Sequence, residues 1–318
     1  DLSPDMISDG TVPIIAIATT GTFNQREQSD SSLRIYQIDE DKGSKSLWDF
    51  LKERKTFDGQ RRDLIIVYDE GHNLSDQQVE LLFDLEPEAI LVASATLRTP
   101  GKLGLMIERL KTAGWQQEDL VTIVSSKDVV EAQLVKRQIV LGGYETSMEL
   151  ALEPMLRKME ALQSKVDQLG LNIRPKAIYV CKTNINQEDG TVDDPAKEFD
   201  LRKAPPILIW KHLVKQGIDP TTIAVYCDLK FVKDFPPPDN FILFSQGEKD
   251  FEEFQKGDFR HIIFNLSLQE GWDDPDCYFA YIDKSMESTV QVEQVIGRVL
   301  RQPGATHYPD ADLNTAHF

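Results

Sequence analysis

The stretch IIVYDEGHNL, residues 65–74, joins a short apolar run to two adjacent carboxylates, a glycine and a histidine. The apolar run has the length and composition of a strand that is buried on both faces of a sheet. Asp69 and Glu70 follow directly where that strand ends. Because ligands of parallel α/β sheets bind beyond the carboxyl ends of the strands, this stretch predicts both a fold and a site.

Short apolar runs and helical patterns alternate along most of the chain. The runs predict strands, buried on both faces, within residues 11–20, 63–70, 88–96, 119–126, 176–183, 222–228, 241–246, 261–268 and 277–284. Apolar residues at i, i+3 and i+4 predict helices over 75–85, 101–115 and 206–217. This alternation is typical of an α/β protein with parallel sheets flanked by helices.

Two features refine the helices and the domain division. Ser75, with Gln78 three residues later, predicts an N-cap for the helix over 75–85. Gly142 and Gly143 break the chain between the two series of strands, and the next helix carries Pro154 and ends near Gly170. We therefore expect two domains, residues 1–142 and 143–318.

The composition indicates a globular protein, because 41% of its 318 residues are hydrophobic and 28% are charged. The first ten residues, DLSPDMISDG, lack the features of a secretory signal and resemble a cut point. Cys181, Cys227 and Cys277 are widely spaced, which favours a reduced cytoplasmic chain without a zinc site. The net charge of −18 argues against broad nucleic-acid binding, although local contacts remain compatible with it.

Three groups of residues could carry chemistry, and each also has a plain structural interpretation. Asp69 could hold Mg²⁺ and Glu70 could activate a water, or the pair begins a solvated loop. VASATLR, residues 92–98, offers two hydroxyls near such a site, or is ordinary loop chemistry. Asp273, in the stretch EGWDDP, could accept a ribose hydroxyl, or it orders an Asp-Pro turn.

The stretch STVQVEQVIGRVLRQPG, residues 288–304, predicts a helix with a narrow polar stripe. That stripe contains Gln291, Gln294, Arg298 and Arg301. The opposite, buried face is predicted to contain Val292, Val295, Ile296, Val299 and Leu300. Two arginines in one stripe suit phosphate oxygens, although a solvated polar face is the simpler alternative. Gly297 inside the helix suggests a close approach by another group.

These groups, in this order, resemble the core of superfamily 2 helicases and translocases. Asp69-Glu70-Gly71-His72, Ser94-Ala95-Thr96, the 271–273 turn and the 294–301 stretch are similar to that family's motifs II, III, V and VI. The segments DEGHNLSDQQ and EGWDDP are most similar to the Res subunits of type III restriction enzymes. The resemblance implies two tandem RecA-like lobes with parallel sheets flanked by helices, the first lobe incomplete.

The resemblance also implies roles for individual residues. Glu70 would be the general base. Arg298 and Arg301 would be the finger arginines, supplied from the second lobe to stabilise the charge on the transferring phosphate. The groups that contact Mg²⁺ or the nucleotide would be Asp69, Gln294, Gly271 and Asp273. Hydrolysis would be coupled to movement by His72, Ser94 and Thr96. The nucleic-acid backbone would be held by Thr20, Gly21, Thr22, Cys181, Lys182 and Thr183.

The activity that this resemblance implies is ATP- and Mg²⁺-dependent movement on double-stranded DNA, with ATP held between the two lobes. The partners would be DNA and the modification (methyltransferase) subunit of a cytoplasmic restriction complex, with no membrane. DKGSKSLWDF, residues 41–50, is not a phosphate-binding loop, because the required glycine spacing is absent. That loop is expected before Asp1 and a nuclease domain after the chain, so we expect this piece alone to hydrolyse ATP weakly or not at all.

Two alternatives stay open. The chain could belong to another superfamily 2 motor that acts on RNA or on chromatin-like substrates. It could also be a non-catalytic scaffold that has lost its phosphate-binding loop.

Overall fold

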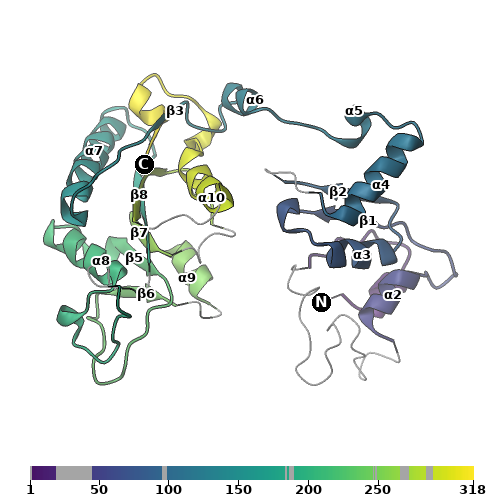
Figure 1. Ribbon diagram of the computed structural model, residues 1–318, viewed down its shortest axis with the longest axis horizontal. Coiled ribbons are helices and arrows are strands. Elements are labelled where there is room, and N and C mark those ends of the chain that lie inside the picture. Colours follow the sequence, from purple (N-terminus) through teal and green to yellow (C-terminus); the bar gives the residue numbers. More distant parts are fainter. Residues whose placement is uncertain are drawn as a thin grey trace. The chain divides into compact units, whose positions relative to one another are not determined.

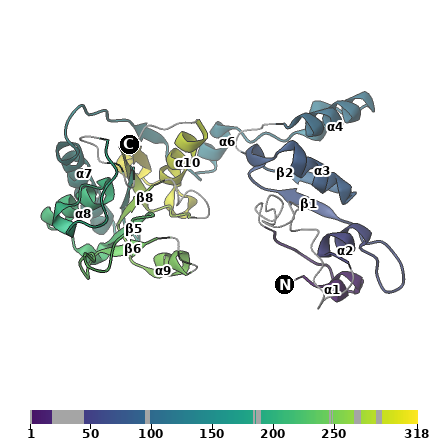
Figure 2. The same cartoon turned by 60° about the horizontal axis from the view of Figure 1, so that its bottom comes forward.

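The chain divides into two compact units, Asp1–Ile123 and Val124–Phe318. The computed structural model, drawn in Figures 1 and 2, describes residues 2–18, 45–94, 99–182, 185, 190–245, 247, 249–265, 272–283 and 289–318. For residues 289–291 and 294 it describes the backbone alone. The division that the sequence predicts, near residue 142, lies inside the second unit, because β3 (Gln138–Val140) pairs with β9 (Thr315–His317).

The first unit is built around a parallel pair of strands. Its elements are α1 (Pro4–Ser8), α2 (Leu47–Glu53), β1 (Ile65–Tyr68), a 3-10 turn (Gly71–Asn73), α3 (Asp76–Asp84), β2 (Ala89–Val92), α4 (Gly101–Thr112) and α5 (Gln117–Leu120). Ile66, Tyr68 and Ile90 pack with residues of α3 and with Leu103 of α4. Ile65 and Val67 alternate with these residues and are exposed.

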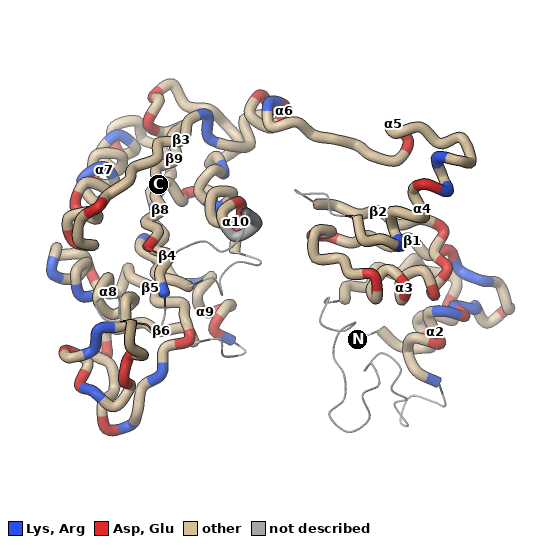
Figure 3. Tube along the Cα trace, in the orientation of Figure 1, with Lys and Arg blue, Asp and Glu red and all other residues tan. Residues whose placement is uncertain are grey.

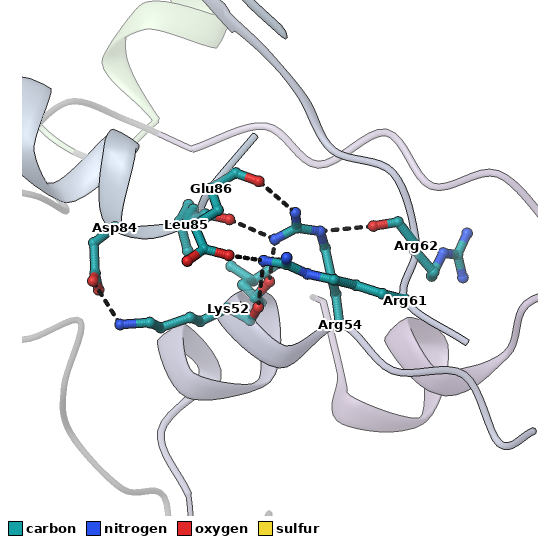
Figure 4. A network of polar contacts seen from close by, with 8 residues as sticks. Lys52, Arg54, Arg61, Arg62, Asp84, Leu85 and Glu86 are labelled. Carbon is teal, nitrogen blue, oxygen red and sulfur yellow. Dashed lines mark hydrogen bonds and ion pairs between the residues drawn. The ribbon is translucent and has the colours of Figure 1, made fainter. Parts of the chain in front are cut away.

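A buried arginine ties two helix ends together in this unit. Arg54 is the residue at which α2 ends, in the left-handed region with φ of 31°. Its guanidinium donates to the carbonyls of Arg62, Leu51, Leu85 and Glu86. Figure 4 shows the bonds to Arg62, Leu85 and Glu86. Four carbonyl acceptors satisfy the charged group, which is only 3% exposed.

The second unit contains a seven-stranded sheet in the order β3-β9-β8-β4-β7-β5-β6, with every pairing parallel. Its other strands are β4 (Lys176–Cys181), β5 (Ile223–Tyr226), β6 (Ile242–Phe244), β7 (His261–Phe264) and β8 (Cys277–Asp283). Its α-helices are α6 (Ser126–Glu131), α7 (Met148–Gln168), α8 (Pro205–Lys215), α9 (Asp250–Lys256) and α10 (Thr289–Leu300).

Helices cover both faces of this sheet. Figure 1 shows α7 and α8 on one side and α9 and α10 on the other, and each pair packs into its own hydrophobic cluster with the strands. The predicted α/β class, a parallel sheet flanked by helices, is therefore confirmed for this unit. The RecA-like arrangement of two lobes stays a prediction.

Most of the predicted elements are found. Ser75 caps α3, and its hydroxyl and the Gln78 side chain form a reciprocal capping box. The long helix carries Pro154 and ends just before Gly170, as expected. None of the helices within the described ranges is long and apolar enough to cross a membrane.

Two predicted strands are wrong. Residues 11–18 and 119–126 contain no strand, and Ile15, Ile17 and Ile123 are at least 80% exposed. An apolar run becomes a strand only where a neighbouring strand completes its hydrogen bonds. Neither segment has such a neighbour in the part of the chain that is described. The prediction of strands buried on both faces is also wrong for β1 and β2, whose burial alternates along each strand.

Candidate functional site

The acidic pair lies at the carboxyl end of β1, as the sequence predicts. Asp69 and Glu70 are both exposed there. Glu70 adopts the left-handed region, with φ of 54° and ψ of 49°, and its backbone amide donates to Asp69 Oδ1 at 2.9 Å. A non-glycine residue in this region costs about 1–3 kcal/mol, and such residues cluster at functional sites. The turn therefore presents two carboxylates in a fixed, strained conformation.

Gly71 brings this turn into contact with the end of β2. Its amide donates to the Ala93 carbonyl at 2.8 Å, and the Ala93 amide donates to the Tyr68 carbonyl at 2.9 Å. A Cβ atom on Gly71 would lie 2.3 Å from Val92 Cγ1 and 3.5 Å from Ser94 Cβ. The two motifs that the sequence places 25 residues apart are thus in direct contact, and a glycine is required between them.

His72 lies beside the acidic pair in the same turn. Its Nδ1 atom is 3.2 Å from Glu70 Oε2, and its side chain is 10% exposed, against 59% for Glu70. The imidazole is therefore placed between the solvent-exposed carboxylate and the packed interior of the turn. Ser94 is half-buried at the end of β2, whereas Thr96 lies outside the described residues.

The carboxylates fit a lightly held Mg²⁺ better than a protein-enclosed metal. Within the described ranges, no group of three or more His, Cys, Asp or Glu side chains is placed to hold a metal ion. Mg²⁺ usually keeps several waters and binds one or two carboxylates together with substrate phosphates. The exposed carboxylate of Asp69 meets that smaller requirement, and Asp69 is the residue that would hold the ion.

The arginines lie at the end of α10 and directly after it. Arg298 is half-buried, donates through Nη1 to the Trp272 carbonyl, and lies 5.8 Å from the centre of the Trp272 ring. Burial, followed by repulsion from Arg301, lowers the pKa of Arg298. Arg301 pairs with the carboxylate of Asp273, and both of these side chains are about half exposed. Both arginines are therefore bound to one turn, residues 272–273.

The helix differs from its predicted pattern in three respects. It ends at Leu300, so Arg301 is not on the predicted helical stripe and instead forms an antiparallel bridge with Val135. Val292 is 36% exposed, so it does not belong to the buried face that Val295 and Val299 form. A Cβ atom on Gly297 would contact none of the described atoms, which contradicts the predicted close approach.

The predicted nucleic-acid residues are only partly described. Cys181 ends β4 and is fully buried, so its thiol is unavailable to a nucleic acid, while the adjacent Lys182 is exposed. Outside the described residues lie Thr20, Gly21, Thr22, Thr183 and Gly271, and for Gln294 the side chain is not described. Figure 3 shows lysines and arginines interspersed with acidic residues along both units, rather than gathered in one run.

Two residues at the arginine site have no role in the sequence prediction, although Trp272 belongs to the 271–273 turn that it names. Trp272 supplies both a carbonyl and a ring to Arg298, and it is 7% exposed and packs against Phe254. Lys136 is buried beside the same turn and donates to the carbonyl of Pro275, which follows the turn, and to that of Val299 in α10. The aromatic residue next to Asp273 was a usable signal for Trp272. Nothing in the sequence around Lys136 distinguishes it from a surface lysine.

Comparison with known proteins adds no family assignment. No family model matches the chain, and no curated protein matches it.

Proposed function

We propose that the chain is the ATP-hydrolysing core of a superfamily 2 motor that acts on double-stranded DNA within a type III restriction system. One observation carries the proposal. Two exposed carboxylates follow a parallel strand on a strained turn, and the Gly71 amide fixes that turn to the Ala93 carbonyl at the end of the neighbouring strand. A solvated loop has no need of such a close contact with the end of a neighbouring strand.

In this proposal the acidic turn prepares the attacking water. Glu70 accepts a proton from the water, and His72, 3.2 Å from its carboxylate, passes movement of the turn to Ser94. Mg²⁺, when bound through Asp69, would neutralise charge that develops on the phosphate oxygens. The His72 imidazole holds the Glu70 carboxylate close to the turn before the substrate arrives.

The second unit supplies the positive charge that phosphoryl transfer requires. Arg298 and Arg301 would contact the phosphates of the same nucleotide, and such finger arginines are worth about 10³–10⁵ in rate. Arg301 must leave Asp273 to do so, and because that pair is half exposed, exchanging one carboxylate for a phosphate costs little. Gln294 and Gly271 are the further nucleotide contacts proposed.

DNA would be held through its backbone, with Lys182 as the described residue that is exposed for this role. The interspersed charge in Figure 3 suits a few local contacts better than a broad basic surface. Site selection would then belong to a separate modification subunit.

The test is ATP hydrolysis by the protein expressed from its whole reading frame, with duplex DNA, single-stranded DNA and RNA as separate activators. Glu70→Gln should lower kcat by about 10²–10⁴. The matched control is Glu86→Gln, because Glu86 is also an exposed glutamate of the first unit with positive φ. Equal activity of Glu70→Gln and Glu86→Gln would contradict the assignment. Stimulation by RNA alone would favour another superfamily 2 motor.

A non-catalytic scaffold is the second candidate, and the Arg301–Asp273 pair favours it, since each charge already has a partner. If no nucleic acid stimulates hydrolysis, ATP binding in equilibrium dialysis separates the two ideas. A motor should bind ATP and should bind it more weakly after Arg301→Ala, whereas a scaffold should show no binding in either form.

A further inference from the structure

Lys136 is a buried cation whose hydrogen-bond acceptors, among the described residues, are all backbone carbonyls. It is 2% exposed, and its Nζ atom donates to the carbonyls of Cys277 at 3.0 Å, Val299 at 2.9 Å and Pro275 at 3.4 Å, and also to that of Arg301. No ion pair with a carboxylate involves it within the described residues. An ammonium group has three donors, so four carbonyls satisfy it fully.

Burying a charged group costs free energy, so its presence in the interior suggests a specific role. Burial lowers the pKa of Lys136 to about 8, and the Tyr278 ring lies 4.1 Å from its Nζ atom. A leucine or methionine of similar length would fill the space without that cost. The carbonyls, however, include those at the end of α10, which have no partners within the helix and which favour a cation.

The four carbonyls belong to two different segments. Pro275 and Cys277 join the turn that binds both arginines to the start of β8, whereas Val299 and Arg301 lie at the end of α10 and directly after it. Nζ of Lys136 therefore joins the turn to the helix end. Its position is fixed by the backbone as well, because the Lys136 amide donates to the Leu300 carbonyl at 2.6 Å.

We propose that Lys136 is a positioning residue for Arg298 and Arg301, which it holds in register with the Trp272–Asp273 turn. The inference rests on the proposed function, since it assigns a purpose to the arginine geometry. The ammonium group acts through carbonyls that flank the arginines. It therefore fixes the backbone from which the two arginine side chains extend, and it takes no part in the reaction.

The main experiment compares Lys136→Met with Lys165→Met in the protein from the whole reading frame. Lys165 is a partly exposed lysine of the same unit, paired with Asp310 and Asp312. Displacement of a catalytic group by ~1 Å costs about 10²-fold. We expect Lys136→Met to lower kcat by about that factor while KM for ATP changes less than about threefold, and Lys165→Met to change neither.

A mutant cycle separates positioning from general structural damage. If Lys136 acts only through the two arginines, adding Lys136→Met to the variant Arg298→Ala with Arg301→Ala should make that variant no slower. A further loss in the triple variant would overturn the proposal, as would a kcat of Lys136→Met within twofold of the parent. Lys136→Arg keeps the cation and should retain at least about tenfold more activity than Lys136→Met. Equal loss in both variants also overturns the proposal.

Hydrogen exchange provides a readout that does not need ATPase activity. In Lys136→Met, peptides over residues 272–277 and 299–302 should exchange faster, while those over β4 and β5 stay protected. If the parent protein hydrolyses no ATP, the proposed function fails. Selective exchange still tests whether Lys136 joins the turn to the end of α10. Uniformly faster exchange across the second unit would show that Lys136 only supports the fold.

Discussion

The strands of the two units have the same composition and yet bury their side chains differently. In β1, Ile65 and Val67 are 63% and 68% exposed, whereas Ile178 of β4 and Val225 of β5 are fully buried. All four residues lie in apolar runs of parallel strands. The difference comes from what covers the sheet, because helices pack on both faces of the seven-stranded sheet and the described helices of the first unit pack on one face.

The largest expected effect contrasts a buried ion pair with an exposed one. Arg202 and Asp193 are 2% and 3% exposed, and Arg202 also donates to the Lys230 carbonyl. Arg202→Met should destabilise the second unit by about 3–5 kcal/mol, because it leaves a buried carboxylate unpaired. Lys52→Met, which removes the exposed pair with Asp84 in the first unit, should cost at most about 1 kcal/mol.

Chemical denaturation followed by hydrogen exchange measures these costs separately in each unit. If the two substitutions cost the same, the difference in burial between the units does not hold in solution.

A matched valine pair tests the sheets directly. Val225→Ala should destabilise the second unit by about 2–3 kcal/mol through lost burial and a cavity, whereas Val67→Ala should stay within about 0.5 kcal/mol. Protection of the β5 and β1 amides in native-state hydrogen exchange gives both values. A cost for Val67→Ala equal to that for Val225→Ala would mean that the exposed face of β1 is covered in the whole protein.

These contrasts show what sequence patterns can establish. Runs of consecutive apolar residues correctly predicted β1, β2 and the strands expected within residues 143–318. Such a run reflects the preference of a short segment for the strand conformation. The same reasoning gave burial on both faces for β1, which depends on elements far away in the chain. Residues 119–126 contain Leu120, Val121, Ile123 and Val124 but form no strand, since a strand also needs a neighbour with which to pair.

The site was predictable to a similar degree. The position of Asp69 and Glu70 at a strand end follows from the pattern, and so does the helix that carries Arg298. The hydrogen bond between Gly71 and Ala93 and the contacts of Lys136 with Pro275 and Val299 join segments that are distant in sequence. Periodicity within one segment contains no information on such contacts.

Lowering the pH should lower the free energy of unfolding of the second unit more steeply than that of the first unit, because of the buried histidines of the second unit. Burial, with repulsion from Arg260 and Arg174, lowers the pKa of His261 to about 3, and burial also lowers that of His317 to about 4. Below pH 6.5 the unfolded chain binds a proton at His261 that the folded chain does not, so stability falls as the pH falls from 6.5 towards 3. The slope from His261 is about 1.4 kcal/mol per pH unit.

His261→Gln should flatten that slope in urea unfolding measured between pH 6.5 and 4. His72→Gln, in the first unit, is the control and should leave the slope of the second unit unchanged. An unaltered slope in His261→Gln would show that other groups cause the acid sensitivity.

The smallest expected effect concerns Gly297 and separates stability from function. Because a Cβ at this position contacts no described atom, Gly297→Ala should stabilise α10 by about 0.5–1 kcal/mol. Thermal unfolding of the second unit should therefore shift upwards. If another group approaches this helix during turnover, the same substitution should lower kcat although the protein is more stable. A gain in stability with unchanged kcat would leave the glycine without a role in the motor, while a loss of stability would place a neighbour at Gly297 in the folded protein itself.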